Sequence, residues 1–140
     1  MIDDKQFEDL CCDLLDSLNQ FENVMKMGGA PGDLKRDITA TERIETAFGI
    51  EHRKWIVQCK HYLKSKVTPN DLPSLTNAIS THNADGLLVI TSGELTPNAR
   101  IYLEKFSNDS KNPYKAMWIE KHKLEDLLEN NPELKNKYWD

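Results

Sequence analysis

The sequence predicts an α/β fold, a mixed β-sheet flanked by helices, built as a single domain over residues 1–140. Two observations lead to this expectation. The front half shows one helical pattern followed by three extended stretches that include a hairpin, and in the back half helical and extended stretches alternate. The expected order is therefore α-β-β-β-α-β-α-β-α. A length of 140 residues suits one hydrophobic core.

The front half begins with an amphipathic helix, expected over roughly residues 3–19, because apolar side chains recur there at helical spacing. Those side chains are Phe7, Leu10, Cys11, Leu14, Leu15 and Leu18. The stretches that follow are predicted as a strand at 21–27, a turn at 28–33, a strand at 36–40 with an extension toward 48 left open, a hairpin loop at 49–53 and a strand at 54–62.

The back half begins with a helix around residues 72–79. A strand is predicted at 86–91, where a continuous apolar run suits a strand covered on both faces. Thr96 and Pro97 form a helix-start signal, with Thr as the cap and Pro at the first helical position. The remaining elements are a last strand at 115–121 and a closing helix marked by Leu124, Leu127 and Leu128.

Composition limits the class of protein. Hydrophobic residues make up 39% of the chain and charged residues 29%, which is ordinary for a soluble globular protein. No apolar run approaches the ~18 residues of a membrane span, and the acidic start of the chain differs from a signal peptide. We therefore expect a cytoplasmic protein with no membrane partner. The three cysteines include no Cys-x-x-Cys pair, which argues against a disulfide framework and a zinc site.

The most informative polar residues are Asp37 and the tripeptide Gln58-Cys59-Lys60. Asp37 falls at the end of one predicted strand. Gln58 and Lys60 lie two residues apart on the next, so their side chains share one face while Cys59 turns to the other. A carboxylate, an amide and an amine in this arrangement can build a Mg²⁺-dependent phosphodiesterase.

Charge is distributed unevenly around this candidate site. The net charge of −5 argues weakly against a protein that coats nucleic acid. Residues 1–32 hold two bases against seven acids, whereas residues 33–66 hold eight bases against five acids. An enzyme that must release DNA needs a local positive groove, and the basic surplus surrounds the candidate residues.

Each candidate residue also has a structural interpretation. Asp37 taken alone is more simply a strand-end aspartate bonded to nearby backbone amides, and Lys60 in an apolar strand admits a structural ion pair with it. Glu8 taken alone is a solvated helix residue. His61 points away from Lys60 and is interpreted as a core or surface histidine.

An ordered set of motifs extends the pattern over roughly residues 5–130. The motifs are Phe7-Glu8, Gly28-Gly29-x-x-Gly32-Asp33, Asp37, Val57-Gln58-Cys59-Lys60, Asp85-Gly86, the strand Leu87–Ile90, Thr91-Ser92-Gly93 and Ala99. Each motif is weak by itself. In this order, the chain resembles the Mrr-like branch of the restriction-endonuclease-like, or PD-(D/E)xK, nuclease superfamily. The resemblance implies a restriction-endonuclease-like mixed sheet, with an αβββαβ core and an additional αβα unit.

The resemblance also implies a metal site. Mg²⁺, for which Mn²⁺ is expected to substitute, would be held by Asp37, the Gln58 amide oxygen and the Cys59 main-chain carbonyl. Lys60 would hold the attacking water or stabilise the phosphorane.

Two further acids are implied, and two departures from the family stand out. Glu8 would reach the site from the first helix, directly or through water, and Asp33 would shape the loop or support the site indirectly. The family's usual glycine two residues before the catalytic aspartate is Lys35 here. The segment between the second and third strands is also long, so residues 41–54 are expected to form an extended hairpin.

The expected function is a Mg²⁺-dependent endonuclease that hydrolyses phosphodiester bonds in double-stranded DNA, as the effector of a restriction or antiphage defence system. A double-strand cut needs two sites, so we expect a homodimer or higher oligomer. The chain is either a fragment, an effector joined to a sensor or ATPase domain in a longer chain, or a nuclease with little sequence preference. Three rivals stay open: a catalytically inactive DNA-binding or assembly module, a structure-selective nuclease for branched DNA or RNA, and an unrelated interaction domain.

Overall fold

The computed structural model of the chain describes residues 2–26 and 37–139. Its elements, in chain order, are α1 (Asp4–Ser17), β1 (Phe21–Lys26), β2 (Asp37–Thr46), β3 (Gly49–Lys60), the 3₁₀ helix η2 (Pro69–Asp71), α2 (Leu75–Thr81), β4 (Gly86–Thr91), α3 (Pro97–Asn108), β5 (Lys115–Ile119), α4 (Lys121–Glu129) and α5 (Pro132–Tyr138). The predicted order of helices and strands is confirmed, with η2 and α5 added to it.

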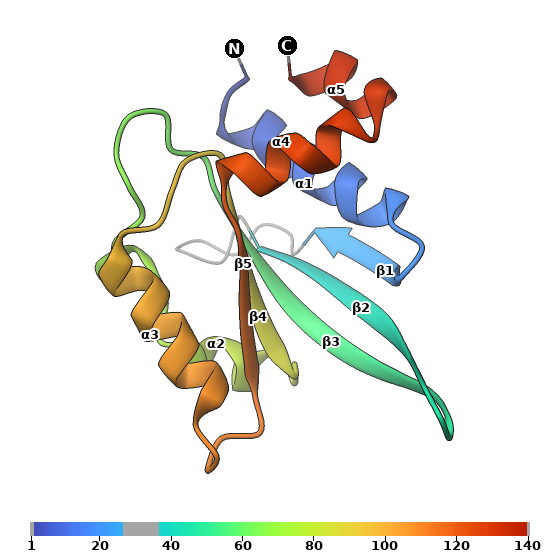
Figure 1. Ribbon diagram of the computed structural model, residues 1–140, viewed down its shortest axis with the longest axis vertical. Helices are drawn as coiled ribbons and strands as arrows, with labels where there is room; N and C mark the ends of the chain where they lie inside the picture. The colour runs from blue at the N-terminus through green and yellow to red at the C-terminus, as the bar shows by residue number, and fades with distance from the viewer. Residues whose placement is uncertain (1, 27–36, 140) are drawn as a thin grey trace.

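The strands form one mixed sheet in the order β1-β2-β3-β4-β5. The β1–β2 and β2–β3 pairs are antiparallel, whereas the β3–β4 and β4–β5 pairs are parallel. Each parallel pair needs a crossover connection, which α2 and α3 supply. Figure 1 shows α1, α4 and α5 gathered together, apart from α2 and α3. The mixed sheet flanked by helices is therefore confirmed.

The sheet separates the expected single core into two buried clusters. On one face, Phe7 of α1 and Leu124 of α4 belong to the same cluster as Val57 of β3. On the other face, Leu103 of α3 belongs to the same cluster as Ile56 of β3. Neighbouring residues of β3 thus face opposite clusters, as the two-residue repeat of a strand requires. The inner part of β3 is consequently fixed from both sides.

The helix ends follow the signals in the sequence. Asp3 caps α1, because its carboxylate accepts a hydrogen bond from the Gln6 backbone N–H at 2.7 Å. Thr96 caps α3 in the predicted manner, and its hydroxyl oxygen accepts from the Ala99 N–H at 3.2 Å. Short polar side chains therefore set both helix starts.

The expected hairpin loop at residues 49–53 is wrong. These residues belong to β3, and the ladder with β2 continues to the pair Thr46–Gly49, which leaves a two-residue turn at Ala47 and Phe48. The Thr46 hydroxyl donates to the Gly49 carbonyl at 2.9 Å and accepts from the Phe48 N–H at 3.1 Å. Gly49 has φ of +127°, a conformation that favours glycine. The extended hairpin expected at 41–54 is present.

The C-terminal segment adds a helix that the sequence did not predict. Pro132 occupies the first turn of α5, and the Asn131 side chain accepts from the Leu134 N–H at 3.3 Å. The Tyr138 hydroxyl donates to Asp13 of α1 at 2.6 Å, which ties the end of the chain to its first helix. No helix in the described part of the chain is long and apolar enough to cross a membrane.

Candidate active site

The β2–β3 ladder brings two of the candidate positions together. Asp37 is the backbone partner of Gln58 in the antiparallel register. For Asp37, only the backbone belongs to the described part of the structure. The glycine-rich turn predicted at 28–33, together with Asp33 and Lys35, lies outside the described residues. The register therefore supports the predicted neighbourhood of Asp37 and Gln58 at the level of the backbone.

Gln58 is a buried polar residue in the middle of an apolar strand. Its exposed fraction is 5%, and its Oε1 atom is buried and accepts no hydrogen bond from any described residue. Buried polar atoms are nearly always paired, because leaving one unpaired costs free energy. An amide oxygen is also one of the hard ligands that Mg²⁺ accepts. The unpaired Gln58 oxygen therefore fits a bound cation.

Lys60 ends β3 beside a carboxylate that the sequence did not single out. The pKa of Asp71 is lowered chiefly by a hydrogen bond from the Thr68 N–H, with smaller contributions from the Thr68 and Tyr62 hydroxyls and from the charge of Lys60. Burial raises the pKa of Tyr62, and its contact with Asp71 adds to this. Lys60 thus lies near a polar group held by η2.

Cys59 has the orientation expected from strand alternation. Its side chain is buried in the cluster under α1, next to the Cys11 thiol. Burial is the main cause that raises the pKa of Cys11 well above its ordinary value. Both thiols are therefore packing groups. Gln58 and Lys60, which flank Cys59, belong to the opposite face.

Glu8 lies on α1, on the Cys59 side of the sheet. Its exposed fraction is only 7%, so the solvated interpretation of this residue is wrong. Its negative charge contributes to the raised pKa values of Cys11 and Cys12, behind burial in both cases. Its catalytic role stays a prediction.

His61 is a structural residue that holds the end of β3. Its ring stacks on Phe7, with 5.0 Å between the ring centroids. Nε2 lies 2.9 Å from the Ile2 carbonyl, to which it donates a hydrogen bond, and Nδ1 forms a hydrogen bond with the Ser92 hydroxyl at 2.8 Å. The Ser92 oxygen also accepts from the Tyr62 N–H at 2.9 Å. These bonds fasten the ends of β3 and β4 to the N-terminus.

Comparison with known proteins identifies the family. A family model for the Mrr catalytic domain, described as restriction endonuclease, matches residues 1–117. The chain belongs to this restriction endonuclease family. The resemblance read from the sequence is thereby confirmed.

Two solved structures share the fold of this restriction endonuclease domain. The first is the DNA modification-dependent restriction endonuclease AspBHI, with a TM-score of 0.64, 15% identity, and coverage of 98% of this chain and 36% of that chain. The second is the MspJI restriction endonuclease in complex with a 27-mer oligonucleotide, with a TM-score of 0.62, 13% identity, and coverage of 95% and 30%. The chain thus spans about a third of each. No curated protein matches the sequence.

Membership of this family raises the question of which described residues could hold a divalent metal ion. Within residues 2–26 and 37–139, no group of three His, Cys, Asp or Glu side chains is arranged to hold a metal ion. The buried Gln58 oxygen, which has no hydrogen-bond partner among the described residues, is one atom that suits a cation. The sequence signal that finds it is a polar residue inside an apolar strand. No comparable signal marks Asp71, whose proximity to Lys60 depends on the tertiary fold.

Proposed function

We propose that this restriction-endonuclease-like domain is a Mg²⁺-dependent endonuclease that cuts double-stranded DNA as part of a restriction or antiphage defence system. One observation supports it above all: the buried, unpaired Gln58 oxygen in register with Asp37, with Lys60 two residues further along the strand. A merely structural glutamine would be expected to satisfy its buried amide oxygen.

In this proposal, Asp37, the Gln58 oxygen and the Cys59 main-chain carbonyl hold the cation. Bound Mg²⁺ supplies stabilisation of the negative charge that develops on the phosphate, and a surface on which water is oriented. Lys60 is half-buried at the strand end, where its amino group is proposed to hold the attacking water or the phosphate oxygens. Glu8 and Asp33 are proposed as supporting acids.

The choice of DNA draws on the family and on its fold relatives. AspBHI is described as dependent on DNA modification, and MspJI as bound to an oligonucleotide. We extend DNA as the substrate from those proteins to this chain. Because a double-strand cut requires two such sites, the active form is proposed to be a dimer or higher oligomer.

The test is cleavage of supercoiled plasmid by the full chain with Mg²⁺ or Mn²⁺. Asp37→Ala and Lys60→Ala should each reduce cleavage to background. Lys105→Ala, at the far end of α3, is the matched control and should cleave like the wild type. Persistent cleavage by both site variants would overturn the assignment of the site. Absence of cleavage by the wild type with either metal would favour an inactive module.

A further inference from the structure

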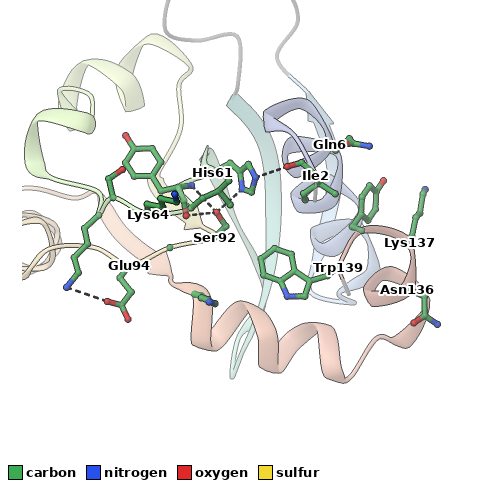
Figure 2. Close-up of a pocket in the computed structure, with 16 residues that line it drawn as sticks. Ile2, Gln6, His61, Lys64, Ser92, Glu94, Asn136, Lys137 and Trp139 are labelled. Atoms are coloured by element: carbon green, nitrogen blue, oxygen red, sulfur yellow. Dashed lines mark hydrogen bonds and ion pairs between the residues drawn. The ribbon is translucent and has the colours of Figure 1, made fainter.

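A cavity of about 910 Å³ opens at the carboxyl ends of β3 and β4 (Figure 2). Its walls come from the segment after β3, the segment after β4, the start of α4, and both ends of the described chain, Ile2 and Trp139. His61 and Tyr62 contribute to the wall and directly follow Lys60 in sequence. The cavity therefore lies at the same end of β3 as Lys60.

The cavity is basic although the chain is acidic. Four lysines line it (Lys64, Lys66, Lys121 and Lys137), against a single acid, Glu94. Four positive charges less one negative charge leave a surplus of three, whereas the whole chain has a net charge of −5. A concave wall with one sign of charge concentrates ligands of the opposite sign. The cavity therefore favours an anionic ligand.

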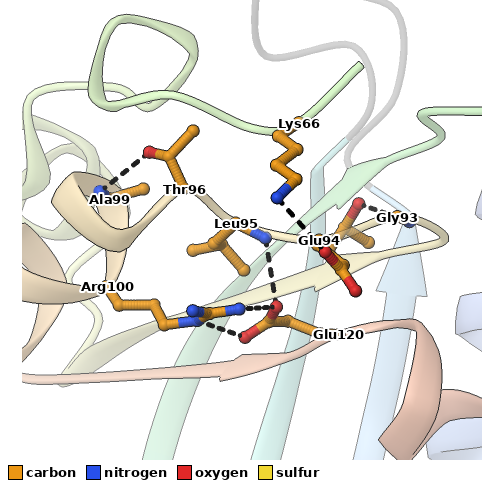
Figure 3. Close-up of polar contacts among 9 residues, drawn as sticks. Lys66, Gly93, Glu94, Leu95, Thr96, Ala99, Arg100 and Glu120 are labelled. Atoms are coloured by element: carbon orange, nitrogen blue, oxygen red, sulfur yellow. Dashed lines mark hydrogen bonds and ion pairs between the residues drawn. The ribbon is translucent and has the colours of Figure 1, made fainter. Parts of the chain in front are cut away.

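Two of these lysines are available for a ligand. Lys66 forms an ion pair with Glu94 at 3.6 Å, as Figure 3 shows, and Lys137 pairs with Asp13 at 3.5 Å. Within the described part of the chain, neither Lys64 nor Lys121 has an ion-pair partner, and both are exposed. Exposed cations of this kind are the groups that neutralise phosphates in nucleic-acid complexes.

The apolar part of the cavity wall suits the base and sugar of a nucleotide. The apolar side chains of Ile2, Leu63 and Trp139 belong to the wall together with the lysines. Figure 2 shows Ile2 beside His61, to whose ring the Ile2 carbonyl is hydrogen-bonded. An aromatic ring provides a surface on which a base stacks, while lysines contact the phosphates on either side of it. Lysines with an aromatic ring match a nucleic-acid strand better than a simple inorganic anion.

The walls are held in place by hydrogen bonds. Glu120 accepts two hydrogen bonds from Arg100, at 2.9 and 2.7 Å, and one from the Leu95 N–H at 3.1 Å (Figure 3). Gly93 lies so close to Tyr62 that a Cβ atom there would be 2.9 Å from the Tyr62 carbonyl oxygen. The segment after β4 therefore presents a preformed wall.

We infer, on the basis of the nuclease function proposed above, that the DNA strand flanking the cut enters this cavity. Lys64 and Lys121 contact its phosphates, and Trp139 stacks against a sugar or base. The scissile phosphate is held at the end of β3, and the same strand then continues past His61 and Tyr62 into the basic cavity. The cavity is in this way a positioning site for the substrate.

The experiment measures binding of a short duplex oligonucleotide to the full chain without a divalent metal, so that no cleavage occurs. The double variant Lys64→Ala/Lys121→Ala should bind at least about 10-fold more weakly, and the slope of log K against log salt should fall by about 2, because two phosphates are no longer neutralised by lysine. The matched control is Lys105→Ala/Lys111→Ala, which removes the same charge from the opposite end of the sheet. It should bind within about 2-fold of the wild type.

Unchanged affinity and salt slope in the Lys64/Lys121 variant would overturn the inference. A free deoxynucleoside monophosphate, titrated against the same proteins, tests the other source of nucleotide phosphate. If the variant loses this ligand but keeps its DNA affinity, the cavity is an effector site and the inference is wrong. Because binding is measured without metal, failure of plasmid cleavage by the wild type would overturn the proposed nuclease function but not the DNA path.

Discussion

The two ends of strand β3 show how differently one strand can be used. The outer end, from Gly49, pairs only with β2 and is exposed, and the turn beside it carries Phe48 with its side chain fully exposed. The inner end, up to Lys60, pairs with β2 and β4 and is covered by helices on both faces. Both ends have the same ladder to β2. Burial and the additional pairing with β4 therefore distinguish the inner end from the projecting arm, which consists of the outer parts of β2 and β3 and the turn between them.

The largest expected effect compares two isoleucines of β3, six residues apart and on the same face. Ile56 is fully buried, whereas Ile50 is 50% exposed. Ile56→Ala should lower the free energy of unfolding by about 2–5 kcal/mol, because it removes buried methyl groups and leaves a cavity. Ile50→Ala should change it by less than about 0.5 kcal/mol. Urea denaturation of both variants checks the difference. Equal losses would mean that the arm is as tightly packed as the sheet.

A second comparison separates function from stability at the inner end. Gln58→Leu removes the unpaired amide oxygen but keeps a side chain of similar size. Unfolding free energy should be unchanged or higher by up to about 1 kcal/mol. Plasmid cleavage should fall at least about 10-fold, about 1.4 kcal/mol in activation free energy. Gln58→Glu, which restores an anionic oxygen, should retain cleavage. A stability loss with unchanged cleavage would assign Gln58 to the core instead.

A third comparison uses pH. Hydrogen bonds from Arg100 are the main cause that lowers the pKa of Glu120, and the Leu95 N–H adds to them. A carboxyl with a lowered pKa stabilises the folded state above its ordinary pKa of about 4.3, and this contribution is lost as the pH falls through the folded value. Glu120→Gln should therefore cost up to about 1 kcal/mol at pH 7, and much less near pH 3.

Glu22→Gln is the control for this prediction. Glu22 pairs with His52 of the arm at 3.2 Å, and both side chains are more than 40% exposed. Its substitution should change unfolding free energy by no more than about 0.3 kcal/mol at either pH. Thermal or urea unfolding at the two pH values measures both variants. If Glu120→Gln costs as much at pH 3 as at pH 7, the loss comes from packing and not from charge.

Another small effect is expected at the tip of the arm. Phe48→Ser removes an aromatic side chain that is fully exposed, so the free energy of unfolding should change by less than about 0.5 kcal/mol. The Thr46 hydroxyl bonds that close the turn involve only the backbone of Phe48 and Gly49, and are kept. A loss above about 1 kcal/mol in urea denaturation would show that Phe48 packs against another part of the protein.

Much of the fold could be predicted, because burial imposes clear patterns. β4 spans the predicted 86–91, since both of its faces are covered and it forms one continuous apolar run. The outer half of β3 was missed for the opposite reason. Exposed strands carry no burial signal, and Gly49 followed by charged residues is typical of a loop. Only the register with β2 assigns those residues to a strand.

Strand alternation predicts the faces on which the β3 residues of the candidate site lie, and nothing more about the site. Alternation separates Cys59 from its neighbours Gln58 and Lys60, and the Cys11 contact agrees with it. The same rule says nothing about Asp71, which lies in another segment and approaches Lys60 only when the chain folds. Helix periodicity leaves Glu8 outside the apolar residues of α1, and its burial could not be predicted because it depends on the tertiary packing of the helix.

The two ends of the described chain, Ile2 and Trp139, meet at the rim of one cavity. Figure 1 likewise shows the N- and C-termini side by side, far from the β2–β3 turn. The chain is therefore suited to circular permutation: a brief linker would connect the old termini, and new ones could be opened between Ala47 and Phe48. Any domain genetically fused to either original terminus would be tethered at the entrance of the cavity.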